Sequence, residues 1–137
     1  MPEPGTEIYV ADTMGELGLI YRIAPVVFIG GSLVEHGGQN PIEPIKLGAA
    51  IAHGPHVWNF ADIYSALDGA GGAEQVNDAA MLMACISRWL TDNQQRKAVT
   101  EAGRHTVDRL GGALDRTLQA LEPYFTQLRL GRHSHDA

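Results

Sequence analysis

The 137-residue chain lacks the features of secreted, membrane-spanning and nucleic-acid-binding proteins. Its one cysteine, Cys85, cannot form a disulfide within the chain, which excludes a secreted domain held together by disulfides. No apolar run reaches the roughly 18 residues of a membrane-crossing helix, and Met1-Pro2-Glu3 does not open a signal peptide. Lysine and arginine number 10 against 16 acidic residues, and the net charge of −6 argues against a general nucleic-acid or anionic-membrane surface. We expect the chain to be cytosolic.

What the chain does contain is enough apolar sequence for a folded core. Hydrophobic residues make up 45% and charged residues 19%, which is ordinary for a globular domain and argues against disorder. The length is that of one domain. We assign residues 1–130 to this domain and residues 131–137 to a disordered tail.

Short apolar runs alternate with helical patterns along the chain. Strands are expected at 8–10, 26–29, 49–52 and 73–76. Helices are expected at 15–23, 41–47, 59–67, 79–90, 91–110 and 113–128. This alternation predicts the α/β class, with a Rossmann-like parallel sheet that has helices on both faces and the strand at 26–29 in its centre.

The C-terminal third of the chain is predicted to be helical. Asp78 caps a helix whose apolar residues share one face, and these are Leu82, Cys85, Ile86, Trp89 and Leu90. Because Trp89 lies on this face, we interpret it as a core residue rather than a platform for a sugar. Gly111 and Gly112 are predicted to separate two further helices. The second of these is amphipathic, and we expect it to pack on the domain or to cross toward another half of the protein.

The most informative segment runs from Gly30 to Pro44. The apolar run at 26–29 is short enough for a buried strand of a parallel sheet, and it stops at a double glycine. A second double glycine follows, and then Asn40 and Pro41 open a helix as its cap and first residue. A strand, a glycine-rich loop and a capped helix in this order are typical of nucleotide sites at the carboxyl ends of parallel strands.

The chemistry of this loop leaves two interpretations open. Backbone N–H groups of Gly30, Gly31, Gly37 and Gly38, together with the Ser32 hydroxyl, suit an anion such as phosphate. Glycine-rich segments are also common as simple turns. No lysine follows in the position that a P-loop requires, so a P-loop is rejected.

Three ordered blocks of the sequence resemble the C-terminal, nucleotide-sugar half of GT-B glycosyltransferases, and in particular the 3-deoxy-D-manno-octulosonic acid (Kdo) transferase family. The blocks are Asp12-Thr13-Met14-Gly15-Glu16-Leu17 with Tyr21-Arg22, the segment Gly30–Pro44, and Gly54-Pro55-His56 with Asn59-Phe60. The pair Glu35-His36 departs from the family, where a proline followed by a basic residue is expected.

The resemblance implies a function for the complete protein, of which this chain would be about a third. That protein transfers Kdo from CMP-Kdo to a lipid A precursor in lipopolysaccharide core biosynthesis, at the cytoplasmic side of the inner membrane. The base is a glutamate in the N-terminal half, so no catalytic residue is expected here, and the chain alone should bind the donor without transferring it. Neither a cofactor nor a bound metal is implied.

The resemblance also implies which residues bind CMP: Met14, Gly15, Glu16, Gly31, Ser32, Asn40, Pro41, Ile42 and Glu43. Met14 to Glu16 would contact the cytosine and ribose, largely through backbone groups. The Glu43 carboxylate would accept hydrogen bonds from both ribose hydroxyls, which suits its two oxygens. Judged from the residues alone, Glu43 could instead complement the helix dipole, Asn40 could simply cap the helix, and Gly15-Glu16 could be a turn with an N-terminal acid.

Three histidines, His36, His53 and His56, lie near predicted loop ends. Their spacing fits no zinc motif, and Cys85 is placed on the apolar face of a helix, so we do not predict a metal site. A role for one of them as a general base stays open. Trp58, which follows Gly54-Pro55-His56 on a predicted loop, could border the cleft.

Two other functions stay open on the sequence alone. The chain could be half of another GT-B glycosyltransferase that uses a different nucleotide sugar. It could also be a non-catalytic nucleotide-binding α/β module that forms a homo-oligomer through an apolar surface. A screen of UDP-sugars and other CMP-sugars would separate the first alternative from a Kdo transferase, and dimerisation with no nucleotide preference would indicate the second.

Overall fold

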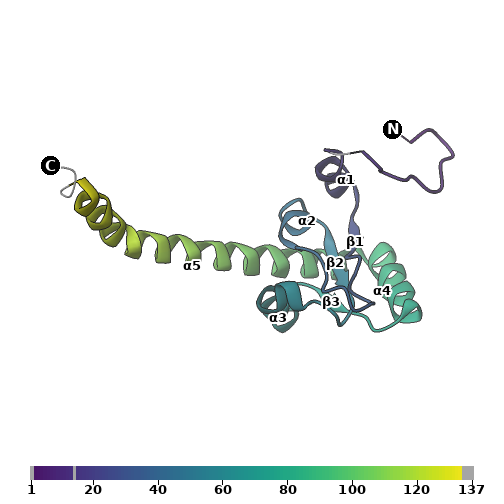
Figure 1. Ribbon diagram of the computed structural model, residues 1–137. Coiled ribbons are helices and arrows are strands. Elements are labelled where there is room, and N and C mark those ends of the chain that lie inside the picture. The colour runs from purple at the N-terminus through teal and green to yellow at the C-terminus, as the bar shows by residue number, and fades with distance from the viewer. Residues whose placement is uncertain (1, 14, 134–137) are drawn as a thin grey trace.

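The computed structural model of the chain describes residues 2–13 and 15–133, the last six of these for their backbone alone. Figure 1 shows a small α/β body from which one long helix projects. The elements follow in the order α1 Leu17–Ile23, β1 Val26–Phe28, α2 Ile42–Lys46, β2 Ala50–His53, the 3-10 helix η1 Trp58–Phe60, α3 Ala61–Gly69, β3 Glu74–Gln75, α4 Ala79–Thr91 and α5 Asn93–His133.

The predicted parallel sheet is confirmed, but its centre is a different strand. The sheet has three parallel strands in the order β1-β2-β3, with Val27 opposite Ile51 and Ala52 opposite Glu74. The strand predicted to be central, 26–29, is therefore at the edge of the described sheet. The strand predicted at 8–10 is absent, and its Ile8 side chain is 83% exposed. The apolar pattern of this segment was not sufficient for a strand, because a strand also depends on pairing with a neighbour.

Successive side chains of a strand point to opposite faces of the sheet, and they build one core on each face. Helices therefore cover both faces, as predicted. On one face Ile51 packs with Ile45 of α2 and Leu67 of α3. On the other face Ala50 and Ala52 pack with α4 side chains. The two alanines are small, so the strand leaves room for the large Trp89 indole on that side.

Helix α4 agrees closely with its prediction. The Asp78 carboxylate accepts a hydrogen bond from the backbone N–H of Met81 at 2.8 Å, which caps the helix. Cys85 and Trp89 are buried, so Trp89 is a core residue as expected. Leu90, which was placed on the same apolar face, is 56% exposed. A side-chain ion pair between Arg88 of α4 and Glu74 of β3, at 2.5 Å, ties the helix to the sheet.

The two helices predicted on either side of Gly111-Gly112 are one continuous helix, α5. Neither glycine has a positive φ, and a glycine inside a helix costs only about 1 kcal/mol relative to alanine. That cost does not end a helix between good helix formers such as Leu110 and Ala113. The helix also continues through Pro123 and includes residues 131–133 of the predicted tail, while 134–137 lie outside the described residues.

Only the first half of α5 packs on the domain. Val99 joins the core beside α4, and Val107 joins the core beside α2 and α3. Gly103 lies against Gly72, where an added Cβ would be 2.9 Å from the Gly72 carbonyl oxygen, so the helix passes very close to the chain before β3. Beyond Leu110 the helix leaves the body, and nearly all its described side chains are exposed (Figure 1). Of the two expectations for 113–128, packing on the domain is therefore wrong, and crossing toward another half of the protein stays a prediction.

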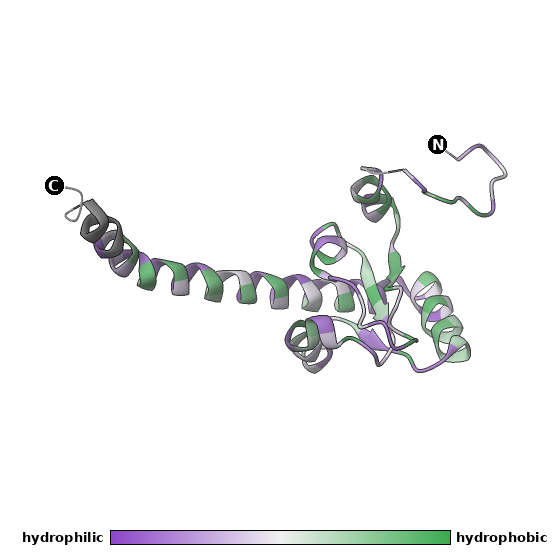
Figure 2. Ribbon diagram, in the orientation of Figure 1, coloured by the Kyte–Doolittle hydropathy of each residue, from purple (hydrophilic) through white to green (hydrophobic). Residues whose placement is uncertain are grey.

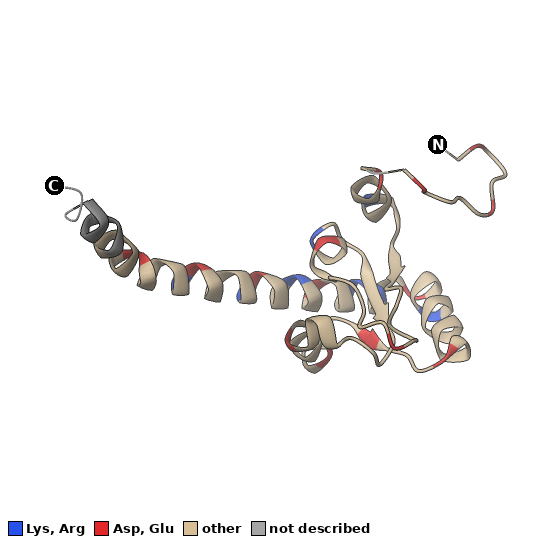
Figure 3. Cartoon of the chain, viewed as in Figure 1, with Lys and Arg blue, Asp and Glu red and all other residues tan. Residues whose placement is uncertain are grey.

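The surface chemistry follows this division. Figure 2 shows apolar residues recurring along the projecting part of α5, and the exposed ones include Leu114, Leu118, Leu121 and Phe125. Figure 3 shows charges of both signs along the same helix, while the strands are nearly free of charge. Among the helices of the described part of the chain, none has the length and apolar character needed to cross a membrane.

Candidate functional site

Two loops meet at the carboxyl ends of the parallel strands. We call residues 30–38, which follow β1, the glycine loop, and residues 54–57, which follow β2, the second loop. Because β1 and β2 are parallel neighbours, both loops leave the same edge of the sheet. In open α/β sheets this edge is where ligands bind. All three blocks of the sequence that carry the family resemblance lie in or beside these loops and helices α1 and α2.

The glycine loop folds back on itself. The backbone N–H of Gly38 donates to the carbonyl of Gly31 at 3.1 Å. Gly31, Gly37 and Gly38 have φ values of 68°, 100° and 73°, in the left-handed region that favours glycine. The His36 ring lies over Gly31, where an added Cβ would be 2.8 Å from a ring carbon. The double glycines therefore form a tight, closed turn.

The third block packs directly on this loop. The backbone N–H of Asn59 donates to the carbonyl of Gly37 at 3.2 Å. An added Cβ on Gly37 would lie 2.4 Å from the Asn59 side-chain nitrogen and 2.8 Å from the Trp58 indole nitrogen. Trp58 is 54% exposed beside the loop. Blocks two and three thus form one structural unit with Trp58 at its side, while a position of Trp58 at the border of the ligand cleft stays a prediction.

Ser32 has a different role from the one suggested by its sequence. Its side chain is fully buried, and its hydroxyl donates to the carbonyl of Ile29 at 2.5 Å. The same oxygen accepts a hydrogen bond from the backbone N–H of Gly54 at 2.8 Å. The hydroxyl therefore joins the two loops and is not directed to a phosphate in this arrangement. Contact of Ser32 with a donor through its backbone stays a prediction.

The start of α2 presents the next group of predicted residues. The Asn40 side-chain oxygen accepts a hydrogen bond from the backbone N–H of Ile42 at 3.0 Å. This hydrogen bond satisfies an N–H group at the start of α2, but the helix begins at Ile42 with Pro41 in the N-cap position, so the predicted cap and first residue are each displaced by one. Pro41 is buried, Ile42 is half-buried and Glu43 is exposed in the first turn. Of these residues, Asn40 and Glu43 have polar side chains open to solvent.

Asn40, Ile42 and Glu43 line an open pocket of about 440 Å³ between α1 and α2. Gly18 lines the α1 side of the pocket, where an added Cβ would lie 3.7 Å from a Glu43 carboxylate oxygen. Two cationic side chains, Arg22 and Lys46, also line it. The carboxylate can accept hydrogen bonds from hydroxyl groups, and the cations attract an anion. The pocket is thus suited to a ligand that carries both.

The pKa of Tyr21, on α1 beside this pocket, is affected by burial and by the charge of Glu43. Burial, and then the Glu43 carboxylate, raise the pKa of Tyr21 above 10.0. A neutral phenol has an O–H group to donate, while phenolate would repel the neighbouring carboxylate. Tyr21 on α1 therefore stays neutral beside Glu43 over the physiological range.

Within the first predicted block, Arg22 lines the pocket but Gly15 and Glu16 do not. Gly15 adopts a φ of 96° in the turn before α1, as its predicted turn position requires. The Glu16 carboxylate accepts hydrogen bonds from the Thr13 hydroxyl and, at 3.3 Å, from the Tyr9 hydroxyl. The Glu16 charge is the main cause of a raised Tyr9 pKa. Gly15 and Glu16 do not line the pocket that holds Glu43, and Met14 lies outside the described residues.

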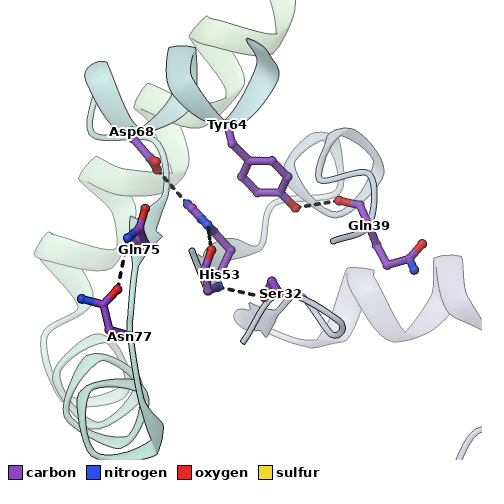
Figure 4. A network of polar contacts seen from close by, with 8 residues as sticks. Ser32, Gln39, His53, Tyr64, Asp68, Gln75 and Asn77 are labelled. Carbon is purple, nitrogen blue, oxygen red and sulfur yellow. Dashed lines mark hydrogen bonds and ion pairs between the residues drawn. The ribbon is translucent and has the colours of Figure 1, made fainter. Parts of the chain in front are cut away.

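A buried polar network behind the loops was missed by the sequence. His53 is fully buried, and its Nδ1 and Nε2 lie 2.7 Å from the Gly54 carbonyl oxygen and 2.9 Å from an Asp68 carboxylate oxygen (Figure 4). Tyr64 packs on the His53 ring with the centroids 4.5 Å apart and donates to the Gln39 carbonyl at 2.6 Å. Tyr64 and Asp68 are four residues apart on a helix, but nothing in the sequence linked that helix face to His53.

The physical environment keeps Tyr64 a hydrogen-bond donor. Burial is the largest cause that raises its pKa, and the charges of Asp68 and Tyr21 follow. His36 and His56 do not join this network; the His56 ring lies 5.9 Å from the Trp58 ring, edge to face. Across the described part of the chain, no group of three or more His, Cys, Asp or Glu side chains is placed to hold a metal ion.

Sequence comparison finds relatives of one kind. No family model matches the chain. It is 37% identical over 125 residues to the 3-deoxy-D-manno-octulosonic acid transferase of Haemophilus influenzae and 36% identical over 123 residues to that of Bordetella pertussis. Each match covers 90% of this chain and 29% of the relative. The chain therefore spans less than a third of the length of these curated relatives.

Structural comparison agrees with the sequence. The fold is similar to the crystal structure of the C-terminal CMP-Kdo binding domain of WaaA from Acinetobacter baumannii, with a TM-score of 0.72 and 30% sequence identity. The similarity covers 74% of this chain and 53% of the other. The fold of most of this chain thus has a counterpart in a solved structure.

Proposed function

We propose, since the chain belongs by sequence and fold to the 3-deoxy-D-manno-octulosonic acid (Kdo) transferase family, that it is the family's C-terminal domain and binds the donor CMP-Kdo. The observation that carries this proposal is the pocket between α1 and α2, where Asn40 and Glu43 lie opposite Gly18. A nucleotide sugar supplies the hydroxyls and the anionic groups that this lining can bind.

In this proposal Glu43 holds the ribose. Its carboxylate is exposed and belongs to no ion pair in the described part of the chain, so both oxygens are available to vicinal hydroxyls. Arg22 and Lys46 attract the phosphate of CMP and the carboxylate of Kdo. We assign the backbone N–H groups of Gly31 and Ser32 to the departing phosphate, and Gly15 and Glu16 to the base and ribose.

The complete enzyme then transfers Kdo to a lipid A precursor. The domain stabilises the negative charge that develops on CMP as the glycosidic bond breaks. We assign the base that deprotonates the acceptor hydroxyl to the part of the family's sequence that this chain does not span. The chain by itself is therefore expected to bind CMP-Kdo without transferring the sugar. The site of action we propose is the cytoplasmic side of the inner membrane, where such an acceptor is available.

The test is a titration of the chain with CMP, UMP and GMP, followed by amide NMR. CMP should perturb the amides of Gly31, Ser32 and the segment 40–43 together, with weak affinity because an open pocket does not enclose the ligand. Equal shifts with all three nucleotides would contradict recognition of cytosine and favour another nucleotide sugar. No shifts at 40–43 with any of them would contradict the pocket assignment.

A further inference from the structure

His53 occupies the centre of the network that joins the two loops to α3. It is the last residue of β2 and is fully buried. Its ring contacts Asp68 and Tyr64 of α3 on one side and the Gly54 carbonyl on the other (Figure 4). His53 does not line the pocket that holds Glu43, so any role in that pocket is indirect.

The two nitrogens of the His53 ring face only acceptors. Nδ1 lies 2.7 Å from a backbone carbonyl oxygen, and Nε2 lies 2.9 Å from a carboxylate oxygen. A neutral imidazole has one N–H group, which would leave the other nitrogen's lone pair facing an oxygen lone pair. A ring with hydrogen on both nitrogens satisfies both contacts, and the Asp68 charge balances its positive charge.

The other groups around the ring do not oppose a positive charge. On α3 they are the Asp68 carboxylate and the Tyr64 hydroxyl, which donates to Gln39. On the neighbouring strand, Gln75 is opposite His53 and is neutral. The nearby carboxylate of Glu74 is paired with Arg88 on α4. Asp68 is therefore the charged group that faces His53 among the described contacts.

Gly54 connects the His53 ring to the two loops. Its own N–H donates to the Ser32 hydroxyl at 2.8 Å, so both backbone polar groups of Gly54 are fixed, one by each partner. The backbone N–H of His56 donates to the Ser32 carbonyl at 2.9 Å and closes the same junction. Through Tyr64, the network also holds the Gln39 carbonyl, directly before Asn40.

We propose that His53 is a positioning residue of the donor site, held as an imidazolium by Asp68 and fixing the glycine loop through Gly54 and Tyr64. The proposal rests on the proposed function for the site that it positions. His53 orients Ser32 and the approach to Asn40, and it does not touch the donor. Loss of the ring's second hydrogen removes either the bond to Asp68 or the bond to Gly54, which loosens the junction of the two loops.

The first experiment reads the ring of the unmodified chain. A long-range ¹H–¹⁵N spectrum at about pH 7.5 should show hydrogen on both nitrogens of His53. A lone-pair nitrogen at Nδ1 or Nε2 of His53 under these conditions would overturn the proposal. This measurement needs neither a ligand nor a variant.

The second experiment uses Asp68→Asn, which keeps the size of the side chain but removes its charge. We expect His53 to lose one hydrogen, the amides of Ser32 and Gly54 to shift, and CMP to bind roughly threefold to tenfold more weakly. Asp68→Glu, which keeps the charge, should restore most of the affinity. Asp62→Asn removes a carboxylate from the same helix and should leave the ring and CMP binding unchanged. An Asp68→Asn chain with a neutral ring and unchanged Ser32 shifts and CMP affinity would overturn the positioning role.

The pH dependence separates positioning from a general loss of structure. In the unmodified chain, CMP affinity should fall in step with the loss of the second ring hydrogen, while the rest of the amide spectrum stays folded. If CMP affinity stays constant while the second hydrogen of the His53 ring is lost, the proposal is overturned. This test holds whether or not the Asp68→Asn chain folds. If the unmodified chain binds no CMP, the proposed function fails, and the ring spectrum together with the Ser32 and Gly54 shifts still decides whether His53 holds the loops.

Discussion

A Cβ atom added to Gly54 would lie 2.1 Å from the carbonyl oxygen of Ser32, so the two loops meet at a contact that only glycine permits. The neighbouring atoms are backbone and cannot move away as a flexible side chain would. The glycine in this block is therefore required by the close approach of two chain segments, and its φ value is not the reason.

Gly54→Ala is expected to destabilise the chain strongly. Overpacking in a tight site costs roughly 1–3 kcal/mol, and contact with backbone atoms places this change at the upper end of that range. Gly30→Ala is the matched control, because an added Cβ there meets nothing within 4 Å and φ is not positive. Urea unfolding of both variants measures the difference. Equal unfolding free energies would contradict the close contact between Gly54 and Ser32.

Glu43→Gln tests the ribose contact against a role at the helix terminus. If Glu43 holds the ribose hydroxyls, CMP affinity should fall by roughly 1.5–3 kcal/mol, the scale of hydrogen bonds to a charged group. If it only complements the dipole of α2, stability should fall by roughly 0.3–1 kcal/mol and affinity should not change. Calorimetric titration and thermal melting of the same variant separate the two.

The matched control for Glu43→Gln is Asp62→Asn, since Asp62 is an acid in the first turn of α3. It should change stability by a similar small amount and leave CMP binding unaltered. A Glu43→Gln chain that melts early and binds CMP normally would remove the main assignment in the pocket.

Stability should decline at alkaline pH because of buried neutral acids. Burial, followed by the Glu74 carboxylate, raises the pKa of the Cys85 thiol from 9.0 to about 12. Between these values the folded chain keeps a proton that the unfolded chain has lost, so the free energy of unfolding falls as pH rises. Burial of Tyr64 acts in the same direction. Below about pH 9 the contribution of Cys85 is fully present.

Urea unfolding at several pH values between about 8 and 11 measures this decline. Cys85→Ala is less stable overall because it leaves a small cavity, but its stability should fall less steeply with pH. Equal slopes for the two chains would show that the Cys85 thiol is not protected by the fold.

Gly111→Ala with Gly112→Ala tests the continuity of α5. In a continuous helix each change should stabilise the helix by roughly 0.5–1 kcal/mol, and the helical signal in circular dichroism should rise. There is space for both side chains, since an added Cβ on Gly111 meets nothing within 4 Å and one on Gly112 is 3.6 Å from Arg116. Gly48→Ala is the contrast, because its φ of 98° makes alanine strained and destabilising. An unchanged helical signal would instead support a break at 111–112.

The sequence predicted the features of the fold that depend on local patterns. The capping of α4 by Asp78, the burial of Trp89 and the parallel alternation of strands and helices are all set by residues close together in the chain. The position of the strand at 26–29 within the sheet was wrong, because strand order depends on long-range pairing. The break at Gly111-Gly112 was wrong because a glycine weakens a helix without necessarily ending it.

The candidate site divides in the same way. Asn40 and Glu43 were found because capping and a first-turn acid leave a pattern in the sequence, and they share a pocket. Whether they bind CMP stays a prediction, as does the role of Gly31 and Ser32. The junction of His53 with Asp68 was not predicted, because the partners are 15 positions apart in the sequence and lie in different elements. A hydrogen bond across that distance leaves no periodic signal.

The two halves of α5 should differ in how their amide hydrogens exchange with water. Around Val99 and Val107 the helix is covered by the core, so its backbone hydrogen bonds open only when the domain unfolds. Beyond Leu110 each backbone hydrogen bond depends on neighbouring turns alone, and a short uncovered helix is marginal in water. One continuous helix therefore contains a slowly exchanging segment and a rapidly exchanging one. A partner that covers Leu114, Leu118 and Leu121 would slow exchange in the second segment without changing the first.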